Sequence, residues 1–425
     1  MSKKIRVLVF PCGSENAIEI NRALRHSVHA DLFGASSVDD HGRFRFEQYI
    51  GGLPNINDKE FDNAFASLIA RLKIDIVFAT HDTVMEYLAS RAQAMRFFLV
   101  NGDPVTTAIA RRKSLTYQSF ADCNWMPNVF NSVNDIKDWP AVIKPDLGQG
   151  GQGVTVVRDI SEATLALSNI LNPVIVEYLP GDELTVDCFT DRNRNLVWVG
   201  PRTRERIKAG IAMRSNLLDV DSEVNGIASE INRRLNFRGP WFFQLKRDRL
   251  DKYKLLEISC RIAGSMAAQR ARGVNLPLMA VQDFLGRSLV TTPNLQVNLI
   301  DRNIATRANF VFKFDTVFVD LDDTLIIEGF AAPLVIAFLY QSIREGKRVK
   351  LITRHESDIS STLYKSRVAL ELFDEIIHLA NGESKADYVT ENSIFIDNHF
   401  PERLEVATKR GVPVLDVDTL EFFLR

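Results

Sequence analysis

The chain has 425 residues, of which 46% are hydrophobic and 25% are charged, a composition typical of a globular protein with about two to four compact units. Its formal net charge of −2 argues against a nucleic-acid or membrane partner, and no apolar run reaches the roughly 18 residues of a membrane-spanning helix. Four scattered cysteines without metal-ligand spacing, and the lack of a signal peptide, predict a cytoplasmic protein with reduced thiols.

Residues 1–110 predict a Rossmann-like α/β domain. Apolar runs predict strands at 5–10, 31–35 and 75–79, with helices at 15–25 and 58–73 between them. Strands that alternate with helices form a parallel sheet covered on both faces. His81 and Asp82 follow the third strand, at the edge where such sheets bind ligands. A polar loop that caps the next helix explains this pair equally well.

Residues 111–307 predict a mixed α+β domain with many short strands. The strands are expected at 141–144, 154–157, 174–177, 184–190, 196–201, 241–247 and 254–259. Lys144 ends the first of them, and four glycines follow within residues 148–153. Glycines let backbone amides approach phosphate oxygens, and a lysine adds a positive charge. A phosphate-binding loop is one interpretation of this segment, and a plain turn is the other.

The segments around the glycines favour a phosphate site. Lys113 begins a helical segment upstream, and a strand ending at Glu177 leads into an acidic turn downstream. Further on, the runs around Gln244 and Glu257 are typical of paired antiparallel strands. Alternation along the second of these strands places Glu257 and Arg261 on the same face.

In this order, the motifs resemble the ATP-grasp superfamily over about residues 1–290, and most closely its branch of carbamoyl-phosphate synthases and carboxylate–amine ligases. The resemblance makes residues 1–110 a pre-ATP-grasp domain and residues 111–307 the ATP-grasp domain. The ATP contacts that it implies are Lys113, Lys144, Gly150, Gly151 and Gly153 at the phosphates, Glu177, Tyr178 and Leu179 at the adenine, and Glu183 at the ribose. The implied magnesium ligands are Gln244 and Glu257, and Arg261 would neutralise charge on the transferred phosphoryl group.

The chain departs from the family pattern where Ser259 replaces an asparagine. A serine hydroxyl is a weaker metal ligand than an amide oxygen, so a second metal ion is less favoured. A basic stretch lies upstream of these strands and contains Arg202 and Arg206. It predicts either a solvated hairpin face or a site that holds an anionic substrate.

Residues 313–425 predict a separate small α/β domain. Strands are expected at 316–320, 348–352, 393–396 and 412–415, and helices at 332–345, 358–370 and 401–410. Asp320 ends the first strand, where a carboxylate can accept a phosphoryl group, and Asp322 can then act as general acid and base. The other residues suited to this chemistry are Thr353 for a phosphoryl oxygen, Lys385 for the charge of a phosphoaspartate, and Asp397, which would bind magnesium with Asp320 and Asp322.

This motif order resembles the haloacid-dehalogenase (HAD) superfamily. Only 28 residues separate Thr324 from Thr353, and 31 separate Thr353 from Lys385, so the domain is expected to lack a cap. Asn398 stands where many members carry a second acid, which predicts weaker metal binding. A fold retained without turnover is the alternative.

These features predict a bifunctional enzyme. One part would join a small-molecule carboxylate to an amine through an acyl phosphate, and the other would hydrolyse a phosphorylated metabolite. The implied cofactors are ATP and Mg²⁺, with Mn²⁺ as a substitute, and an oligomer is compatible with the sequence. Two alternatives are an ATP-sensing module that regulates the phosphatase and an ATP-grasp kinase that phosphorylates a small molecule directly.

Overall fold

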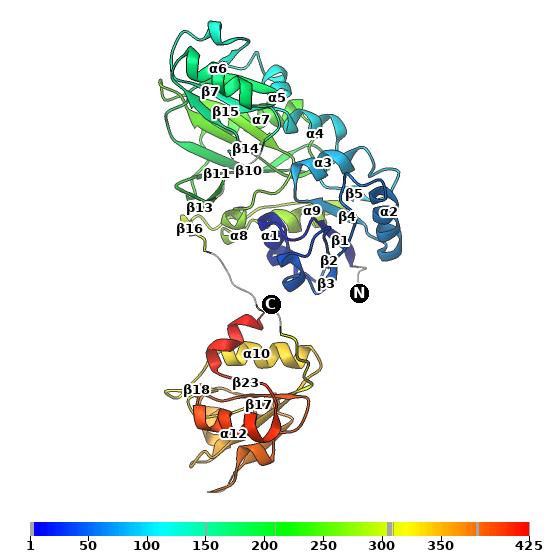
Figure 1. Cartoon of the computed structure of the whole chain (residues 1–425), viewed down its shortest axis with the longest axis vertical. Coiled ribbons are helices and arrows are strands. Elements are labelled where there is room, and N and C mark those ends of the chain that lie inside the picture. The colour runs from blue at the N-terminus through cyan, green and yellow to red at the C-terminus, as the bar shows by residue number, and fades with distance from the viewer. Residues whose placement is uncertain are drawn as a thin grey trace. The chain divides into compact units, whose positions relative to one another are not determined.

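The computed structural model describes residues 4–148, 151–208, 210–303, 308, 310–379 and 382–424. The chain forms two compact units, residues 1–303 and 304–425, each with hydrophobic cores of its own. Figure 1 labels several elements of each unit. Within the described part of the chain, no helix is long and apolar enough to cross a membrane.

The first unit opens with a parallel sheet in the order β3-β2-β1-β4-β5, as the alternation of strands and helices predicts. Its strands are β1 (Ile5–Phe10), β2 (Ala30–Ala35), β3 (Gln48–Ile50), β4 (Ile76–Ala79) and β5 (Phe98–Leu99). Its helices are α1 (Glu15–Leu24), α2 (Phe61–Leu72), α3 (Asp82–Ala89) and α4 (Pro104–Arg111). Ser14 caps α1, because its hydroxyl accepts the N–H of Ala17 at 3.2 Å.

Two antiparallel sheets follow in the same unit. The first, in the order β6-β9-β7-β8, contains β6 (Val129–Phe130), β9 (Pro173–Glu177), β7 (Ala141–Pro145) and β8 (Thr155–Val157). The second, in the order β11-β10-β14-β15, contains β11 (Leu196–Thr203), β10 (Glu183–Thr190), β14 (Gly239–Arg247) and β15 (Tyr253–Ser259). The helices of this part are α5 (Lys113–Ser119), α6 (Ile160–Asn169), α7 (Ser222–Arg234), α8 (Ala267–Ala271) and α9 (Leu276–Phe284). A smaller sheet joins β12 (Arg206–Lys208), β13 (Ile211–Asn216) and β16 (Leu299–Asp301).

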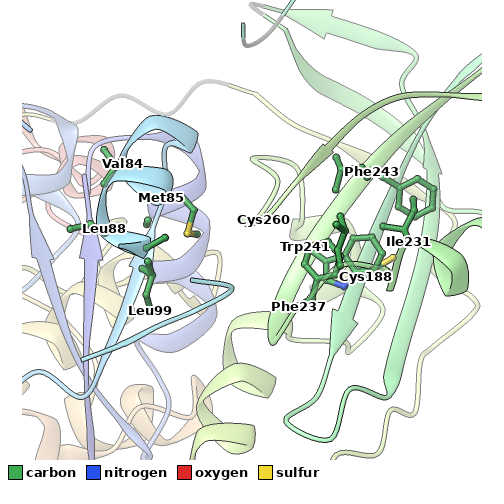
Figure 2. Close-up of a cluster of buried hydrophobic side chains, with 14 of the residues drawn as sticks. Val84, Met85, Leu88, Leu99, Cys188, Ile231, Phe237, Trp241, Phe243 and Cys260 are labelled. Atoms are coloured by element: carbon green, nitrogen blue, oxygen red, sulfur yellow. The ribbon is translucent and has the colours of Figure 1, made fainter. Parts of the chain in front are cut away.

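One hydrophobic core joins the parallel sheet to the second antiparallel sheet. Figure 2 shows its two sides, with Met85 and Leu99 from the α/β layer and Trp241 and Phe237 from the β10–β14 region. The rings of Trp241 and Phe237 stack with their centroids 4.2 Å apart. Because this core spans residue 110, the predicted boundary there lies inside one packed unit. The limits of the three predicted domains stay predictions.

The second unit is built on a parallel sheet in the order β21-β20-β17-β22-β23. Its strands are β17 (Thr316–Val319), β20 (Arg348–Thr353), β21 (Glu375–His378), β22 (Ser393–Ile396) and β23 (Val414–Leu415), and β18 (Ile326–Ile327) pairs with β19 (Phe330–Ala331) in a hairpin. The helices are α10 (Pro333–Arg344), α11 (Ile359–Lys365) and α12 (Phe400–Arg410). The central strand β17 is flanked by β20 and β22, so the carboxyl ends of all three meet at one edge.

Candidate functional site

A cavity of about 620 Å³ lies in the first unit, between the parallel sheet and the two antiparallel sheets. Most residues that the ATP-grasp resemblance assigns to a nucleotide site line it: Lys113, Lys144, Gly151, Glu177, Tyr178, Leu179, Glu183, Gln244, Glu257 and Arg261. Gly153 is not among the lining residues, and Gly150 lies outside the described residues. The tertiary structure thus brings together residues that span almost 150 positions of the sequence.

Lys144 is held at the end of β7 by a tyrosine that the sequence analysis did not single out. Its ammonium donates to the Tyr117 hydroxyl at 2.6 Å, and that hydroxyl donates to the carbonyl of Leu256 at 3.0 Å. Lys144 is 5% exposed, and this burial lowers its pKa to about 8, against the attraction of Glu257 and Glu183. A nearby anion would restore the charged form.

Lys113 begins α5 and contacts the loop that follows Lys144. Its ammonium lies 3.4 Å from the carbonyl of Asp146, whose carboxylate accepts the N–H of Ser114 at 2.7 Å. Burial is the main cause of the lowered pKa of Lys113. Two lysines with destabilised charged forms therefore face one cavity, an arrangement that favours an anionic ligand.

The two acidic residues on the opposite wall have different environments. Glu177 accepts the backbone N–H of Asn128 at 2.8 Å, which fixes its side chain at the end of β9. Glu183 forms an ion pair with Arg204 at 2.6 Å. Arg204 also lines the cavity and donates to the carbonyl of Gly210 at 2.9 Å. Arg204 belongs to the basic stretch of the sequence, which did not distinguish it as a candidate, and it directly follows the end of β11, two positions after Arg202.

The two arginines named as substrate candidates differ in position. Arg202 lines the cavity but is fully buried, and it donates to the carboxylate of Asp187 at 2.7 and 3.3 Å. Arg206 lies outside the lining of the cavity, on β12, and forms an exposed ion pair with Asp301. Arg202 therefore contributes mainly to the structure of the sheet, and Arg206 contacts Asp301 at the end of β16, which is separated from β12 by β13.

Gln244 and Glu257 face each other across β14 and β15. In the amide orientation that satisfies both neighbours, Gln244 donates to Glu257 at 3.2 Å and accepts from Arg204 at 3.1 Å. Burial raises the pKa of Glu257, and Asp82 adds to the rise, whereas Lys113, Arg261 and Lys144 oppose it. The carboxylate of Glu257 is an oxygen donor of the kind that Mg²⁺ prefers, with water or phosphate oxygens as the other ligands. The amide oxygen of Gln244 would have to turn from Arg204 towards Glu257 to join it.

Ser259 and Arg261 do not extend this pair of oxygen donors. The hydroxyl of Ser259 donates to Asp82 at 2.8 Å, and the guanidinium of Arg261 donates to the same carboxylate at 2.9 and 3.0 Å. Asp82 is the residue that the sequence placed at a ligand-binding edge or in a cap. The structure gives it a different role. Its carboxylate accepts hydrogen bonds from two side chains, Ser259 at the end of β15 and Arg261 just beyond it.

In the second unit, charged residues gather at the carboxyl edge of the parallel sheet. The ammonium of Lys385 donates to Asp320 at 2.7 Å and to Asp397 at 2.6 Å. Thr353 is completely buried at the end of β20, and Thr324 donates to Asp320 at 3.3 Å. Burial raises the pKa of Asp320 to about 6, against the attraction of Lys385. Two carboxylates around one cation form a set of donors that also fits Mg²⁺.

Asp322 lies apart from this group and contacts a histidine. His355 Nδ1 is 2.9 Å from Asp322 Oδ1, and His355 Nε2 is 2.7 Å from the hydroxyl of Thr362. These contacts fix the orientation of the ring between Asp322 and Thr362. The sequence analysis missed His355, which follows Thr353 by two residues. Among the described residues, no three or more His, Cys, Asp or Glu side chains form a metal-binding group.

The comparisons with known proteins found one family model and a set of solved structures. A family model described as "ATP-grasp in the biosynthetic pathway with Ter operon" matches residues 171–304. No curated protein matches the sequence.

Several solved structures are similar to the chain at low sequence identity. The biotin carboxylase domain of Hydrogenobacter thermophilus 2-oxoglutarate carboxylase, in complex with MgADP, ADP and bicarbonate, has a TM-score of 0.58 at 13% identity and covers 70% of this chain and 72% of its own. N5-carboxyaminoimidazole synthetase from Staphylococcus aureus, complexed with ADP, has a TM-score of 0.57 at 12% identity, covering 68% and 79%. L-amino acid ligase from Bacillus licheniformis has a TM-score of 0.53 at 17% identity, covering 66% and 74%.

At these identities, the likeness establishes a fold and no more. Together, the family model and the solved structures support an ATP-grasp domain in a chain of mixed α/β architecture.

Proposed function

We propose that the first unit is an ATP-dependent ligase that joins a carboxylate to an amine through an acyl phosphate. The observation that carries this proposal is the convergence of Lys113, Lys144, Glu257 and Arg261 on one cavity of about 620 Å³. A volume of this size accommodates a nucleotide together with a small substrate. The solved structures with this fold include a ligase and two proteins crystallised with ADP, which supports the same reading.

Each of the residues at the cavity has a proposed role that follows from its position. Lys113 and Lys144 would hold the ATP phosphates, with Gly151 and Gly153 in the loop that closes over them. The backbone at Tyr178 and Leu179 would contact the adenine.

Glu183 is the predicted ribose contact, and it would have to exchange its ion pair with Arg204 for that role. The magnesium ligands would be Gln244 and Glu257, and the ion would neutralise phosphate charge when bound.

The proposed reaction has two steps, a phosphoryl transfer and a displacement of phosphate by the amine. An oxygen of the substrate carboxylate attacks the γ-phosphorus of ATP, and the bond from that phosphorus to the bridging oxygen breaks, leaving ADP. The amine then attacks the acyl carbon, inorganic phosphate leaves, and the amine loses a proton. Arg261 faces the cavity and would stabilise the negative charge of the phosphoryl group during the first step.

Trapping with hydroxylamine tests the ligase chemistry. Carboxylates are screened with MgATP and hydroxylamine in place of the amine, and both ADP and the acyl hydroxamate are measured. An acyl phosphate yields equal amounts of the two products. ADP together with a stable phosphorylated product would instead favour the kinase. ATP binding without ADP release under any condition would favour the ATP-sensing module.

We also propose that the second unit is a capless HAD-type phosphohydrolase. What supports it is the group formed by Asp320, Lys385 and Asp397, with Thr353 buried beside it. Asp320 would attack the phosphorus of a phosphomonoester, and the alcohol would leave with a proton from Asp322. Asp322 would then remove a proton from water, which hydrolyses the phosphoaspartate. Mg²⁺ would be held by Asp320 and Asp397.

Leaving-group dependence tests this second activity. Asp320→Asn should abolish hydrolysis of p-nitrophenyl phosphate and of an alkyl phosphate, because an amide is not a competent nucleophile. Asp322→Asn should slow formation of the phosphoaspartate, measured as release of the alcohol in the first turnover, far more for the alkyl phosphate than for p-nitrophenyl phosphate, since only the alkyl leaving group needs a proton. It should slow the later hydrolysis of the phosphoaspartate equally for both substrates. His355→Ala should show the same pattern more weakly, whereas the exposed Tyr364→Ala should show neither effect. Wild-type rates in Asp320→Asn would refute the assignment.

A further inference from the structure

Asp82 makes contacts that neither a helix cap nor a surface loop explains. It is the first residue of α3, three positions after the end of β4, yet no side-chain hydrogen bond caps that helix. Its carboxylate instead accepts from Ser259 on one oxygen, at 2.8 Å, and from Arg261 on the other, at 2.9 and 3.0 Å. Both donors lie more than 170 positions further along the chain.

These contacts leave the guanidinium of Arg261 little freedom. Nε and one terminal nitrogen bind Asp82, while the other terminal nitrogen donates to the carbonyl of Ile262 at 3.2 Å. The guanidinium also lies over the ring of Phe242, 5.4 Å from its centroid. The side chains of Arg261 and Asp82 are only 15% and 16% exposed, so solvent screens the pair weakly. Each terminal nitrogen still retains one N–H for a ligand.

We propose that Asp82 is a positioning residue, which holds the Arg261 guanidinium in the orientation needed for phosphoryl transfer while Ser259 steadies the carboxylate. The inference rests on the proposed ligase function. A donor stabilises a transition state best when it is oriented before the reaction begins. The N-terminal sheet would thus contribute to catalysis through one side chain. The serine that replaces the family's asparagine would serve this contact rather than a metal ion.

The position of Asp82 makes its removal distinguishable from a general loss of structure. Asp82→Asn and Asp82→Ala should lower kcat for ADP release about 10- to 100-fold, because Arg261 loses its orientation. The KM for MgATP should not rise, since the change removes a negative charge from a site that binds phosphates. A merely structural role would raise KM, lower the melting temperature and reduce kcat together.

Glu19→Gln is the matched control. Glu19 belongs to α1 and forms an ion pair with Arg270 at 2.7 Å, which links the same two parts of the unit. The carboxylate of Glu19 is 3% exposed, and neither residue lines the cavity. If loosening of the unit explained the effect of Asp82→Asn, loss of this pair, whose carboxylate is more buried than that of Asp82, should show the effect too. We expect kcat of Glu19→Gln to stay within about 2-fold of the wild type.

A double-mutant cycle tests whether Asp82 acts through Arg261. Arg261→Ala alone should lower kcat, and adding Asp82→Asn should cause no further loss, because the group that it positions is gone. Independent, multiplicative losses would show that Asp82 acts by another route and would overturn the proposal.

A readout without turnover separates this inference from the ligase activity itself. In protein labelled with ¹⁵N-arginine, the Nε–H signal of Arg261 is assigned by its loss in Arg261→Lys. That signal should shift or broaden in both Asp82 variants and stay unchanged in Glu19→Gln. An unchanged signal in both Asp82 variants overturns the positioning role. If the wild type releases no ADP with any substrate, the ligase proposal fails, and this spectrum alone decides whether Asp82 orients Arg261.

Discussion

At the scale of single residues, burial decides the charge state of the groups that face the cavity. Lys144 shows this most clearly, because its ammonium donates to the neutral Tyr117 hydroxyl at 2.6 Å and has almost no contact with solvent. Its pKa falls from 10.5 to about 8. In the empty protein, Lys144 therefore loses its proton as the pH rises through 8, and phosphate binding would favour the charged form again.

Binding of MgATP should thus take up protons at pH 8 to 9, by up to about one proton per site. The uptake is measured by calorimetry in buffers that differ in ionisation enthalpy. Lys144→Arg should abolish it, because arginine stays charged throughout this range. Lys246→Arg, at another residue that lines the cavity, should leave it intact. An equal proton uptake in Lys144→Arg would exclude Lys144 as its source.

The lowered pKa of Lys144 also determines how this residue affects the folding free energy as the pH changes. A lysine with a lowered pKa costs folding free energy while it is charged, so the cost is full below pH 8 and disappears as the pH rises towards 10.5. Bound phosphate would offset this cost at neutral pH. A buried charged side chain that lowers stability without a ligand is typical of a binding site rather than of a stabilising contact.

At the scale of elements, strand β15 presents two of the polar side chains of the candidate site on one face. Glu257 points into the cavity opposite Gln244 of β14, and Ser259 lies on the same face two residues further on. The register with β14 determines which side chain faces Glu257, and α3 supplies the partner of Ser259. The sequence of the strand alone therefore does not show whether Ser259 is a metal ligand or a hydrogen-bond donor to Asp82.

Two substitutions on β15 separate these roles. Glu257→Gln should lower turnover about 100-fold or more with a smaller effect on ATP binding, because it removes the one carboxylate of the proposed metal pair. Ser259→Asn restores the residue of the family pattern. It should lower turnover rather than raise it, since the longer side chain would displace Asp82 from its 2.8 Å contact. A gain in activity and in Mg²⁺ affinity for Ser259→Asn would instead identify position 259 as a metal ligand.

At the scale of the whole molecule, the two units have separate hydrophobic cores. The cores around Leu8, Val77 and Phe243 belong to the first unit, and those around Val319 and Phe395 belong to the second. A ligand that binds one folded unit stabilises that unit by mass action. The effect of MgATP on unfolding should therefore be confined to the first unit.

At constant free Mg²⁺, ATP at about 100 times its Kd should stabilise the first unit by about 2.7 kcal/mol and raise its melting temperature, while the melting temperature of the second unit stays constant. Differential scanning calorimetry checks both transitions. Lys144→Ala should remove the shift without lowering the transition of the empty protein, because the lysine is costly there. Asp320→Asn, in the second unit, should leave the shift unchanged. An undiminished shift in Lys144→Ala would remove Lys144 from the ATP site.

Much of this architecture could be predicted from the sequence alone. Apolar strands that alternate with helices predicted both parallel sheets, because strand and helix periodicity is a local property of the chain. Lys144 at a strand end, followed by glycines, and Asp320 at the end of another strand located the two candidate sites for the same reason. The resemblance to ATP-grasp proteins added the order of Lys113, Glu177 and Glu257.

Only the tertiary structure decided which side chains meet. Asp82 forms an ion pair with Arg261, Glu183 with Arg204, and Asp187 with Arg202. Tyr117 positions Lys144, and His355 contacts Asp322. Each of these contacts joins different elements, and its energy depends on burial and on the packing that brings those elements together. The sequence therefore determines which chemical groups are available at each strand end, whereas packing determines which of them stay free to act on a ligand.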